Sequence, residues 1–380
     1  TIIAARAARV EVIGDVELLW RAMRNHQFVG ITGTNGKSTT TSLIGHILRQ
    51  ARQNVQVGGN LGTPALSLDA LLSAGTYALE MSSFQLDLTK NMSFDIAVLL
   101  NIAPDHLDRH GSMNAYVAAK RKIFRPGQLK IAAIGIDDPD SLNIFKELRL
   151  RDEVQVVPIS TGRRLLDGVA VNGGLLEDHG QAICDLQTAT AITGRHNWQN
   201  AAAAYVVTRG LGIDSEIIAR AILNFSGLAH RMEHIAAING VQFINDSKAT
   251  NSNAAARALA CFNNIYWVAG GRAKSSGLRA VQPYLQRIAH AFLIGEAQES
   301  FSVELTGRVN HTLCGTLDQA VAAATAQARA DGRPGAVVLF SPACASFDQF
   351  TDFEARGDAF RKLVYDLERC ESEQARKIVA

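Results

Sequence analysis

The chain has 380 residues, of which 47% are hydrophobic and 19% charged, and its formal net charge at pH 7 is +2. This length allows two domains that each bury a core, and the composition is that of a globular protein. A charge near zero without a dense run of Lys and Arg excludes a nucleic-acid footprint, and no apolar run reaches the ~20 residues of a membrane span. Five scattered cysteines without a Cys-x-x-Cys pair favour reduced thiols over disulfides or zinc. We therefore expect a cytoplasmic protein without nucleic-acid or membrane partners.

The first part of the chain alternates short apolar runs with helical patterns. The predicted strands cover residues 27–32, 54–57, 77–81, 96–101 and 130–135, and predicted helices cover residues 37–50 and 113–124. Such alternation is typical of a parallel sheet with helices on its faces. We expect a central α/β domain over residues 16–228, preceded at residues 1–15 by a linker or the remnant of another domain.

Turn-forming residues then interrupt the chain between positions 153 and 188, which predicts a small antiparallel appendage built of hairpins. Helical patterns follow at residues 196–209 and 214–224. A second α/β unit is expected over residues 229–380, with a Rossmann-like arrangement. It opens with a hairpin turn at Asn239-Gly240 and has predicted strands at 265–269, 291–294 and 336–340.

A glycine-rich loop joins the strand at residues 27–32 to the helix at 37–50. Its residues are Gly33, Thr34, Asn35, Gly36, Lys37 and Ser38. Backbone N–H groups of such a loop curl around phosphate oxygens, Lys37 neutralises the β- and γ-phosphates, and the Ser38 hydroxyl ligates Mg²⁺. The strict motif requires glycine where this chain has Ile31. A plain glycine turn is the alternative, but the order of strand, loop and helix favours nucleotide binding.

Two further strand ends carry polar side chains. Glu80 ends one strand, and His106 follows another within the segment 101–109. Carboxylates at the ends of parallel strands point into the ligand crevice, so Glu80 is a candidate Mg²⁺ ligand. By pattern alone, Glu80 could equally be a surface carboxylate capping the next turn, and a lone histidine is more often structural than catalytic.

Lys120 lies on the apolar stripe of its predicted helix. Its neighbours three and four positions away are Tyr116, Val117, Ile123 and Phe124. Either the ammonium extends along the stripe into solvent, or it is desolvated, which lowers a lysine's pKa and leaves an amine able to add CO₂. The pattern by itself favours the first reading.

These motifs occur together in one order. Residues 33–41, 58–60, 79–85, 101–109 and 194–200 resemble the Mur ligase family, and residues 230–231, 245–251, 270–274 and 341–353 resemble its D-glutamate-adding members. The Asp-Asn-Pro-Arg motif of the members that add a diamino acid is missing, and Ser38 replaces the glycine usual in folate polyglutamyl ligases. The family normally begins with a uridine-binding domain, of which we expect at most a tail here.

The resemblance implies an ATP-dependent, amide-forming ligase of peptidoglycan synthesis in a bacterial cytoplasm. It would join D-glutamate to UDP-N-acetylmuramoyl-L-alanine through an acyl phosphate, with ATP and two Mg²⁺ ions, and we expect a monomer. Two alternatives remain open: another amino-acid ligase of the Mur and folylpolyglutamate group, or a non-catalytic nucleotide-binding fragment.

The resemblance also implies roles for individual residues. Besides the loop from Gly33 to Ser38 and the adjoining Thr39, the nucleotide set has Asn197 and Asn200 near adenine, Arg231 at the γ-phosphate, and Asp246 and Lys248 at ribose and phosphates. The metal set is Ser38, Glu80, His106 and Lys120, the last carbamylated by CO₂, and the catalytic set is Lys37, His106, Lys120 and Arg231. The substrate set contains Asn60, which would orient the muramoyl substrate, then Ser82 and His106, and a D-glutamate pocket of Thr250, Lys274, Ser346, Phe347 and Phe353.

Three of these assignments have open questions. His196 and Asn197 would equally suit helix N-capping, and Arg231 would suit a salt bridge between domains. Phe347 stands where many members of the family have leucine.

Overall fold

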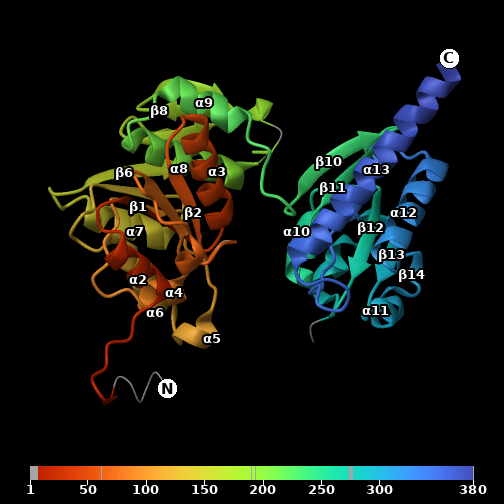
Figure 1. Ribbon diagram of the computed structural model, residues 1–380, viewed down its shortest axis with the longest axis horizontal. Helices are drawn as coiled ribbons and strands as arrows, with labels where there is room; N and C mark the ends of the chain where they lie inside the picture. Colours follow the sequence, from red (N-terminus) through yellow and green to blue (C-terminus); the bar gives the residue numbers. More distant parts are fainter. Residues whose placement is uncertain (1–6, 61, 190, 193, 274–276, 380) are drawn as a thin grey trace. The chain divides into compact units, whose positions relative to one another are not determined.

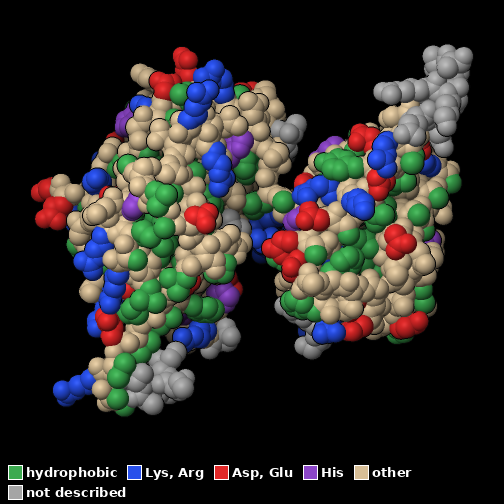
Figure 2. Space-filling view, viewed as in Figure 1, with side chains coloured by type: hydrophobic (Ala, Val, Ile, Leu, Met, Phe, Trp, Pro, Cys, Tyr) green, Lys and Arg blue, Asp and Glu red, His purple; other side chains and the backbone are tan. Residues whose placement is uncertain are grey.

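The protein is described by a computed structural model that covers residues 7–379, apart from residues 61, 190, 193 and 274–276. The chain forms two compact units, Thr1–Ser226 and Gly227–Ala380 (Figure 1). Lys and Arg side chains are interspersed with Asp and Glu over the visible face of each unit (Figure 2). Within the described part of the chain, no helix is both long and apolar enough to cross a membrane.

The described residues of the first unit build a nine-stranded sheet in the order β2-β3-β1-β4-β5-β6-β7-β8-β9. The strands are β1 Gln27–Thr32, β2 Val55–Gly59, β3 Thr76–Glu80, β4 Ile96–Leu99, β5 Ile131–Gly135, β6 Gln155–Ser160, β7 Val169–Asn172, β8 Leu175–Asp178 and β9 Gln181–Asp185. Neighbours from β2 to β7 pair in parallel, and β7, β8 and β9 pair antiparallel. The parallel strands bring their carboxyl ends to one edge, where ligands of such sheets bind.

Helices cover both faces of this sheet. One hydrophobic core lies under α3 Lys37–Gln50, α8 Arg195–Gly210 and α9 Ser215–Leu223. The other lies under α2 Asp15–Ala22, α4 Ser83–Asp87, α6 Met113–Arg121 and α7 Pro139–Leu148. The remaining helical segments are α5 Leu107–His110 and the 3₁₀ turns η1 Ala65–Ser67, η2 Lys122–Phe124 and η3 Leu186–Thr188. Burial on both faces explains why the parallel strands have continuous apolar runs.

The segment 153–188 differs in part from its prediction. The hairpins β7–β8 and β8–β9 form as expected, but β6 is a parallel strand of the main sheet, and β7 continues that sheet. The antiparallel part is therefore an extension of the central sheet, because β6 supplies an edge on which β7 can pair.

Glu17 of α2 is a fully buried carboxylate that ties this helix to the turn after α4. It accepts hydrogen bonds from the backbone N–H groups of Lys90 at 2.9 Å and Met92 at 3.0 Å, and from Arg21 Nε at 3.0 Å. Burial by itself would raise the pKa of Glu17, but the backbone donors outweigh burial and the net shift is downward. The carboxylate therefore stabilises the fold at neutral pH, and this contribution is lost as the pH falls through the lowered pKa.

We expect Glu17→Ala to lower the free energy of unfolding of the first unit by about 3 kcal/mol at pH 7, because the N–H groups of Lys90 and Met92 and the Arg21 side chain lose a buried acceptor. Urea denaturation measures this change. Glu216→Ala, at an exposed position in the first turn of α9, is the matched control and should change stability by less than about 0.5 kcal/mol. Equal effects of the two substitutions would contradict the prediction.

The described residues of the second unit form a six-stranded sheet in the order β10-β11-β15-β12-β13-β14. The strands are β10 Glu233–Ile238, β11 Val241–Asn245, β12 Ile265–Gly270, β13 Ile288–Ile294, β14 His311–Gly315 and β15 Val337–Phe340. The helical segments are α10 Ser252–Leu259, η4 Arg279–Arg287, α11 Gln298–Leu305, α12 Leu317–Asp331 and α13 Phe353–Val379. The hairpin of β10 and β11 turns at Asn239 and Gly240, with φ of 51° and 80°, and the other pairs are parallel. Two cores lie on the two faces.

Candidate active site

The glycine-rich loop connects β1 to α3 as expected. Gly36 stands at the N-cap of α3 with φ of 86°, and a Cβ at this position would collide with Asn200 Oδ1. Both constraints require glycine here. The positive end of the α3 dipole and the N–H groups of its first turn therefore lie at the glycine-rich loop, an arrangement suited to phosphate.

The Lys37 side chain folds back over this loop. Its Nζ donates to the carbonyl oxygens of Gly33 and Thr34, each at 3.1 Å. Ser38 is half-buried and Thr39 is buried in the next turn of α3. The ammonium of Lys37 is thus held at the loop, where it can neutralise phosphate oxygens.

Asparagine side chains brace the loop from neighbouring elements. Asn101, after β4, accepts a hydrogen bond from the backbone N–H of Asn35 at 2.9 Å and donates to Gln199 Oε1 at 2.9 Å. On α8, Asn200 Nδ2 donates to Asn197 Oδ1 at 3.1 Å, and the buried Asn200 Oδ1 has no hydrogen-bond partner among the described residues. A free buried acceptor beside the loop fits a ligand donor.

The N-cap of α8 is Gly194, so the alternative that His196 and Asn197 cap this helix is wrong. Both residues lie inside the helix.

Glu80 ends β3 and is only 2% exposed. Its Oε1 accepts a hydrogen bond from Asn60 Nδ2 at 2.7 Å, whereas Oε2 has no hydrogen-bond partner among the described residues. Ser82 is the N-cap of α4 and accepts from the backbone N–H of Gln85 at 3.2 Å. The surface-capping alternative for Glu80 is therefore wrong, and one carboxylate oxygen is available in a buried setting.

His106 lies at the N-cap of α5 with a left-handed backbone, at φ of 52°. Its side chain is 48% exposed, and its Nε2 lies 3.5 Å from Asp105 Oδ2. The described residues contain no group of three His, Cys, Asp or Glu side chains able to hold a metal ion by themselves. Mg²⁺ in phosphoryl-transfer sites is bound by one or two carboxylates together with phosphates and waters, so Glu80 and Ser38 fit a metal that arrives with a nucleotide.

Lys120 of α6 is 2% exposed and points at the loop. Its Nζ donates to the carbonyl oxygen of Gly33 at 2.8 Å and lies 4.7 Å from the centre of the Tyr116 ring. The solvent-directed reading of this side chain is therefore wrong. Burial, and next the charge of Lys37, lower the pKa of Lys120 to about 7.

Tyr116, also on α6, connects the glycine-rich loop to this helix. Its hydroxyl is 3.0 Å from Thr34 Oγ1, and that Oγ1 also donates to the carbonyl of Ala103 and accepts from its N–H. The apolar spacing of the sequence placed Tyr116 on the stripe with Lys120 but did not reveal this polar contact.

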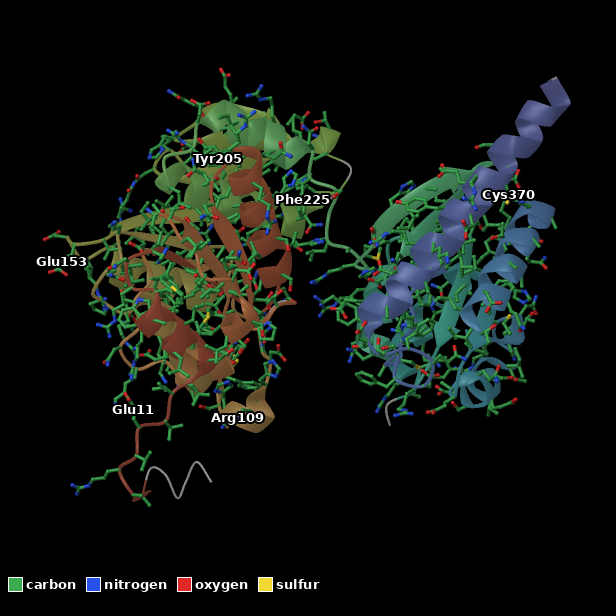
Figure 3. The ribbon with its side chains drawn as sticks, in the orientation of Figure 1. Glu11, Arg109, Glu153, Tyr205, Phe225 and Cys370 are labelled. Carbon is green, nitrogen blue, oxygen red and sulfur yellow. The ribbon has the colours of Figure 1, made fainter. Side chains whose placement is uncertain are left out.

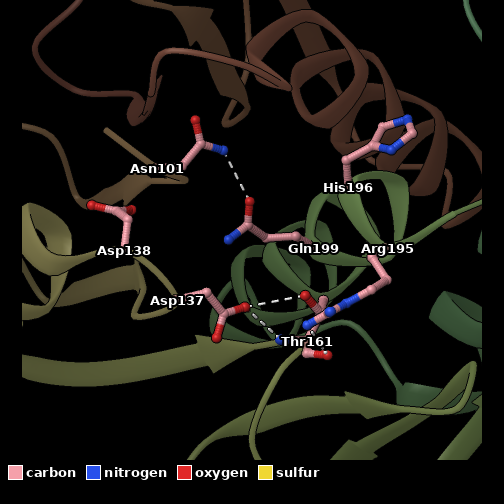
Figure 4. Close-up of a pocket in the computed structure, with 7 residues that line it drawn as sticks. All are labelled: Asn101, Asp137, Asp138, Thr161, Arg195, His196 and Gln199. Carbon is pink, nitrogen blue, oxygen red and sulfur yellow. Dashed lines mark hydrogen bonds between the residues drawn. The ribbon is translucent and has the colours of Figure 1, made fainter. Parts of the chain in front are cut away.

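A cavity of about 220 Å³ opens beside the loop at the ends of β4, β5 and β6 (Figure 4). Its lining residues are Asn101, Asp137, Asp138, Thr161, Arg195, His196 and Gln199. Both carboxylates already accept hydrogen bonds: Asp138 from the N–H groups of Ile102 and Ser141, and Asp137 from Ser160 and Thr161. These hydrogen bonds connect the loop after β5 to the loops after β4 and β6.

In the second unit, Asp246 is buried where β11 ends. It accepts from Ser341 Oγ at 2.8 Å and from the N–H of Met232 at 3.2 Å. Burial raises the pKa of Asp246 to about 7, against the lowering effect of these donors and of Arg231. Lys248 is half-buried, and its Nζ lies 5.5 Å from the centre of the Phe353 ring.

Of the residues expected at the amino-acid site, Thr250 lies on the loop after β11, Ser346 and Phe347 lie on the loop after β15, and Phe353 is the first residue of α13. Thr250 is half-buried beside Lys248, whose carbonyl accepts from the Thr250 N–H at 2.8 Å. Ser346 is buried, whereas Phe347 is 63% exposed. Lys274 lies outside the described residues.

Arg356 of α13 is a buried cation that the sequence pattern did not reveal. Its Nε and Nη2 donate to the hydroxyl and carbonyl oxygens of Ser247, at 3.0 and 2.8 Å, while Nη1 has no hydrogen-bond partner among the described residues. Burial lowers the pKa of Arg356 to about 10. An arginine in a mostly polar helix is normally solvent-facing, so no local signal identifies it.

Comparison with known proteins agrees with this arrangement. Residues 31–208 match the Mur ligase middle domain, and residues 230–344 match the Mur ligase glutamate ligase domain. The UDP-N-acetylmuramoylalanine–D-glutamate ligase of Rhodospirillum rubrum is 52% identical over 370 residues, which are 96% of this chain and 78% of that protein. The enzyme of the same name from Caulobacter vibrioides is 48% identical over 97% of this chain and 80% of its own length.

Solved structures share the fold at lower identity. A UDP-N-acetylmuramoyl-L-alanyl-D-glutamate–2,6-diaminopimelate ligase superposes with a TM-score of 0.63 at 20% identity, covering 92% of this chain and 81% of that one. A MurF protein from Acinetobacter baumannii gives a TM-score of 0.64 at 18% identity, covering 92% of this chain and 78% of that one. The chain belongs to the Mur ligase family, in the group of the UDP-N-acetylmuramoylalanine–D-glutamate ligases.

Proposed function

We propose that this chain catalyses the ATP-dependent ligation of D-glutamate to UDP-N-acetylmuramoyl-L-alanine in peptidoglycan precursor synthesis. The observation that carries the proposal is its 52% identity, over 96% of the chain, to an enzyme whose name states both substrates. The site supports the chemistry, since a phosphate loop, two lysines and a buried carboxylate converge at one sheet edge.

The reaction needs an activated carboxylate. A carboxylate oxygen of the alanyl group attacks the γ-phosphorus and ADP leaves; the amine of D-glutamate then attacks the acyl carbon and phosphate leaves. Negative charge gathers on the phosphoryl oxygens throughout, so the Lys37 ammonium and the N-terminus of α3 supply the main stabilisation within this unit.

Ser38, Glu80 and His106 are the residues that would hold Mg²⁺, as two ions in our proposal. Bound Mg²⁺ would neutralise phosphate charge. The free Oε2 of Glu80 supports this assignment, and the hydrogen bond from Asn60 fixes the orientation of the carboxylate.

Lys120 is proposed to carry a carbamate. The neutral amine adds to CO₂, a nitrogen–carbon bond forms, one proton is released, and a cation becomes an oxygen-bearing anion. The pKa of about 7 leaves about half of the amine neutral at pH 7, whereas at the ordinary pKa of 10.5 only about one lysine in three thousand would be neutral. The new anion would lie near the phosphate loop, where it can bind or orient a metal-binding group.

Substrate binding is proposed for both units. Residues 16–228 would bind ATP, with Asn197 and Asn200 near adenine, and the muramoyl substrate through Asn60, Ser82 and His106. Residues 229–380 would add Arg231, Asp246 and Lys248 for the nucleotide. The D-glutamate pocket would comprise Thr250, Lys274, Ser346, Phe347 and Phe353, since an amino acid with two carboxylates needs a cation and several donors.

The test is ADP release by the 380-residue chain with ATP, Mg²⁺, UDP-N-acetylmuramoyl-L-alanine and one amino acid at a time. We expect D-glutamate to give at least about a hundredfold more ADP than L-glutamate, L-lysine or meso-diaminopimelate, because a polar pocket rejects ligands that leave its groups unpaired. Release driven by another amino acid would identify a different ligase of the family. Nucleotide binding by calorimetry without ADP release under any condition would support a non-catalytic module.

A further inference from the structure

His110, the last residue of α5, links two elements of the proposed metal site. Its Nε2 lies 2.9 Å from the hydroxyl of Ser83, the first residue of α4. Both side chains are enclosed: that of His110 is 5% exposed, and Ser83 is 2% exposed. α4 directly follows Glu80 and Ser82, and α5 directly follows His106. One buried hydrogen bond therefore connects the segment of Glu80 to the segment of His106.

Aromatic contacts strengthen the connection. The Phe84 ring centre lies 4.9 Å from that of His106 and 5.6 Å from that of His110, with which it stacks. The Tyr116 ring centre lies 5.4 Å from that of His110, and Arg109 of α5, labelled in Figure 3, places its guanidinium carbon 5.7 Å from the Phe84 ring. Phe84 thus contacts the rings of both histidines.

The serine, the histidine and the nearby Asp87 do not form a nucleophilic triad. Asp87 Oδ2 is 3.9 Å from His110 Nδ1, too far for a hydrogen bond, and Asp87 Oδ1 pairs with Lys122 at 2.6 Å. Ser83 is also too deeply buried to meet a substrate. The geometry therefore gives Ser83 no role as a nucleophile.

His106 needs such support. Its side chain is 48% exposed, it has a left-handed backbone, and α5 extends only from Leu107 to His110. An exposed ring on a single helical turn loses rotamer freedom when it binds, and a neighbour that fixes it beforehand removes part of that cost.

We propose that His110 is a positioning residue that holds His106 and the segment after Glu80 in one rigid arrangement, through Ser83 and Phe84, for the metal that accompanies ATP. The inference rests on the metal role proposed above for His106. Residues that orient metal ligands typically contribute ten- to a hundredfold to metal affinity.

The experiment measures Mn²⁺ binding to the full chain with a non-hydrolysable ATP analogue by electron paramagnetic resonance, and compares it with kcat and with metal-free affinity for the analogue. His110→Phe keeps the ring but loses the hydrogen bond, and Ser83→Ala removes the partner. We expect each to weaken Mn²⁺ binding and lower kcat about tenfold, with metal-free affinity for the analogue within about twofold. The double variant should lose no more than either single variant, because one shared contact is removed.

Two further variants sharpen the result. His110→Gln retains a terminal amide that can donate to or accept from Ser83, and should recover Mn²⁺ affinity to within about threefold of the unsubstituted chain. His179→Phe, an exposed histidine of the same unit in the turn after β8, should match the unsubstituted chain.

Unchanged Mn²⁺ affinity in both His110→Phe and Ser83→Ala overturns the inference, as do additive losses or a parallel loss of metal-free nucleotide binding. If His110→Phe does not fold, Ser83→Ala decides alone. His106→Ala distinguishes the metal role of His106 from the positioning role of His110. Unchanged Mn²⁺ affinity in this variant contradicts the metal role of His106, and the inference about His110 fails with it. Loss in His106→Ala alone overturns only the role of His110.

Discussion

Lys120→Ala is expected to lose at least about a hundredfold in kcat, because the charged group that faces the phosphate loop is removed from a buried site. Added formate or acetate should restore part of the activity by occupying the vacated anion site. Lys120→Arg should remain inactive, since a guanidinium stays charged and forms no carbamate. Steady-state ADP release measures all three.

The pH and CO₂ dependence of turnover test the same group. The pKa of Lys120 is lowered to about 7, so the neutral amine predominates above pH 7 and is lost as the pH falls through 7. Activity in CO₂-depleted buffer should therefore rise with added bicarbonate, and more CO₂ should be needed at pH 6 than at pH 8. Lys130→Ala, at an exposed lysine before β5, is the control. Turnover indifferent to CO₂ would remove the carbamate from the mechanism.

Lys37→Ala should lower the kcat of ligation roughly a thousandfold and the affinity for ATP roughly tenfold. The cation opposite the β- and γ-phosphates disappears, and Gly33 and Thr34 lose the donor that bridges their carbonyl oxygens. Calorimetry with ATP separates binding from turnover.

Lys146→Ala, on the exposed side of α7, should leave both quantities within about twofold. Near-normal turnover of Lys37→Ala would show that the loop does not act on phosphate.

Patterns that repeat over a few residues determined much of this protein. The alternation of apolar runs and helical patterns predicted the parallel sheets, and the bounds of β1 and α3 agree with their predictions. The Asn239-Gly240 turn and the loop from Gly33 to Ser38 were likewise readable, because turn geometry depends on adjacent residues. The order of the motifs along the chain indicated the resemblance to the Mur ligase family.

Only the tertiary structure decided where buried polar atoms find their partners. Lys120 and Gly33 are 87 residues apart, and a helical pattern shows which face Lys120 occupies but not which carbonyl its ammonium reaches. The same holds for Glu17 with its backbone donors and for His110 with Ser83. Hydrophobic periodicity predicts which residues are buried. The hydrogen-bond partners of these residues depend on how separate elements pack, so only the folded structure identifies them.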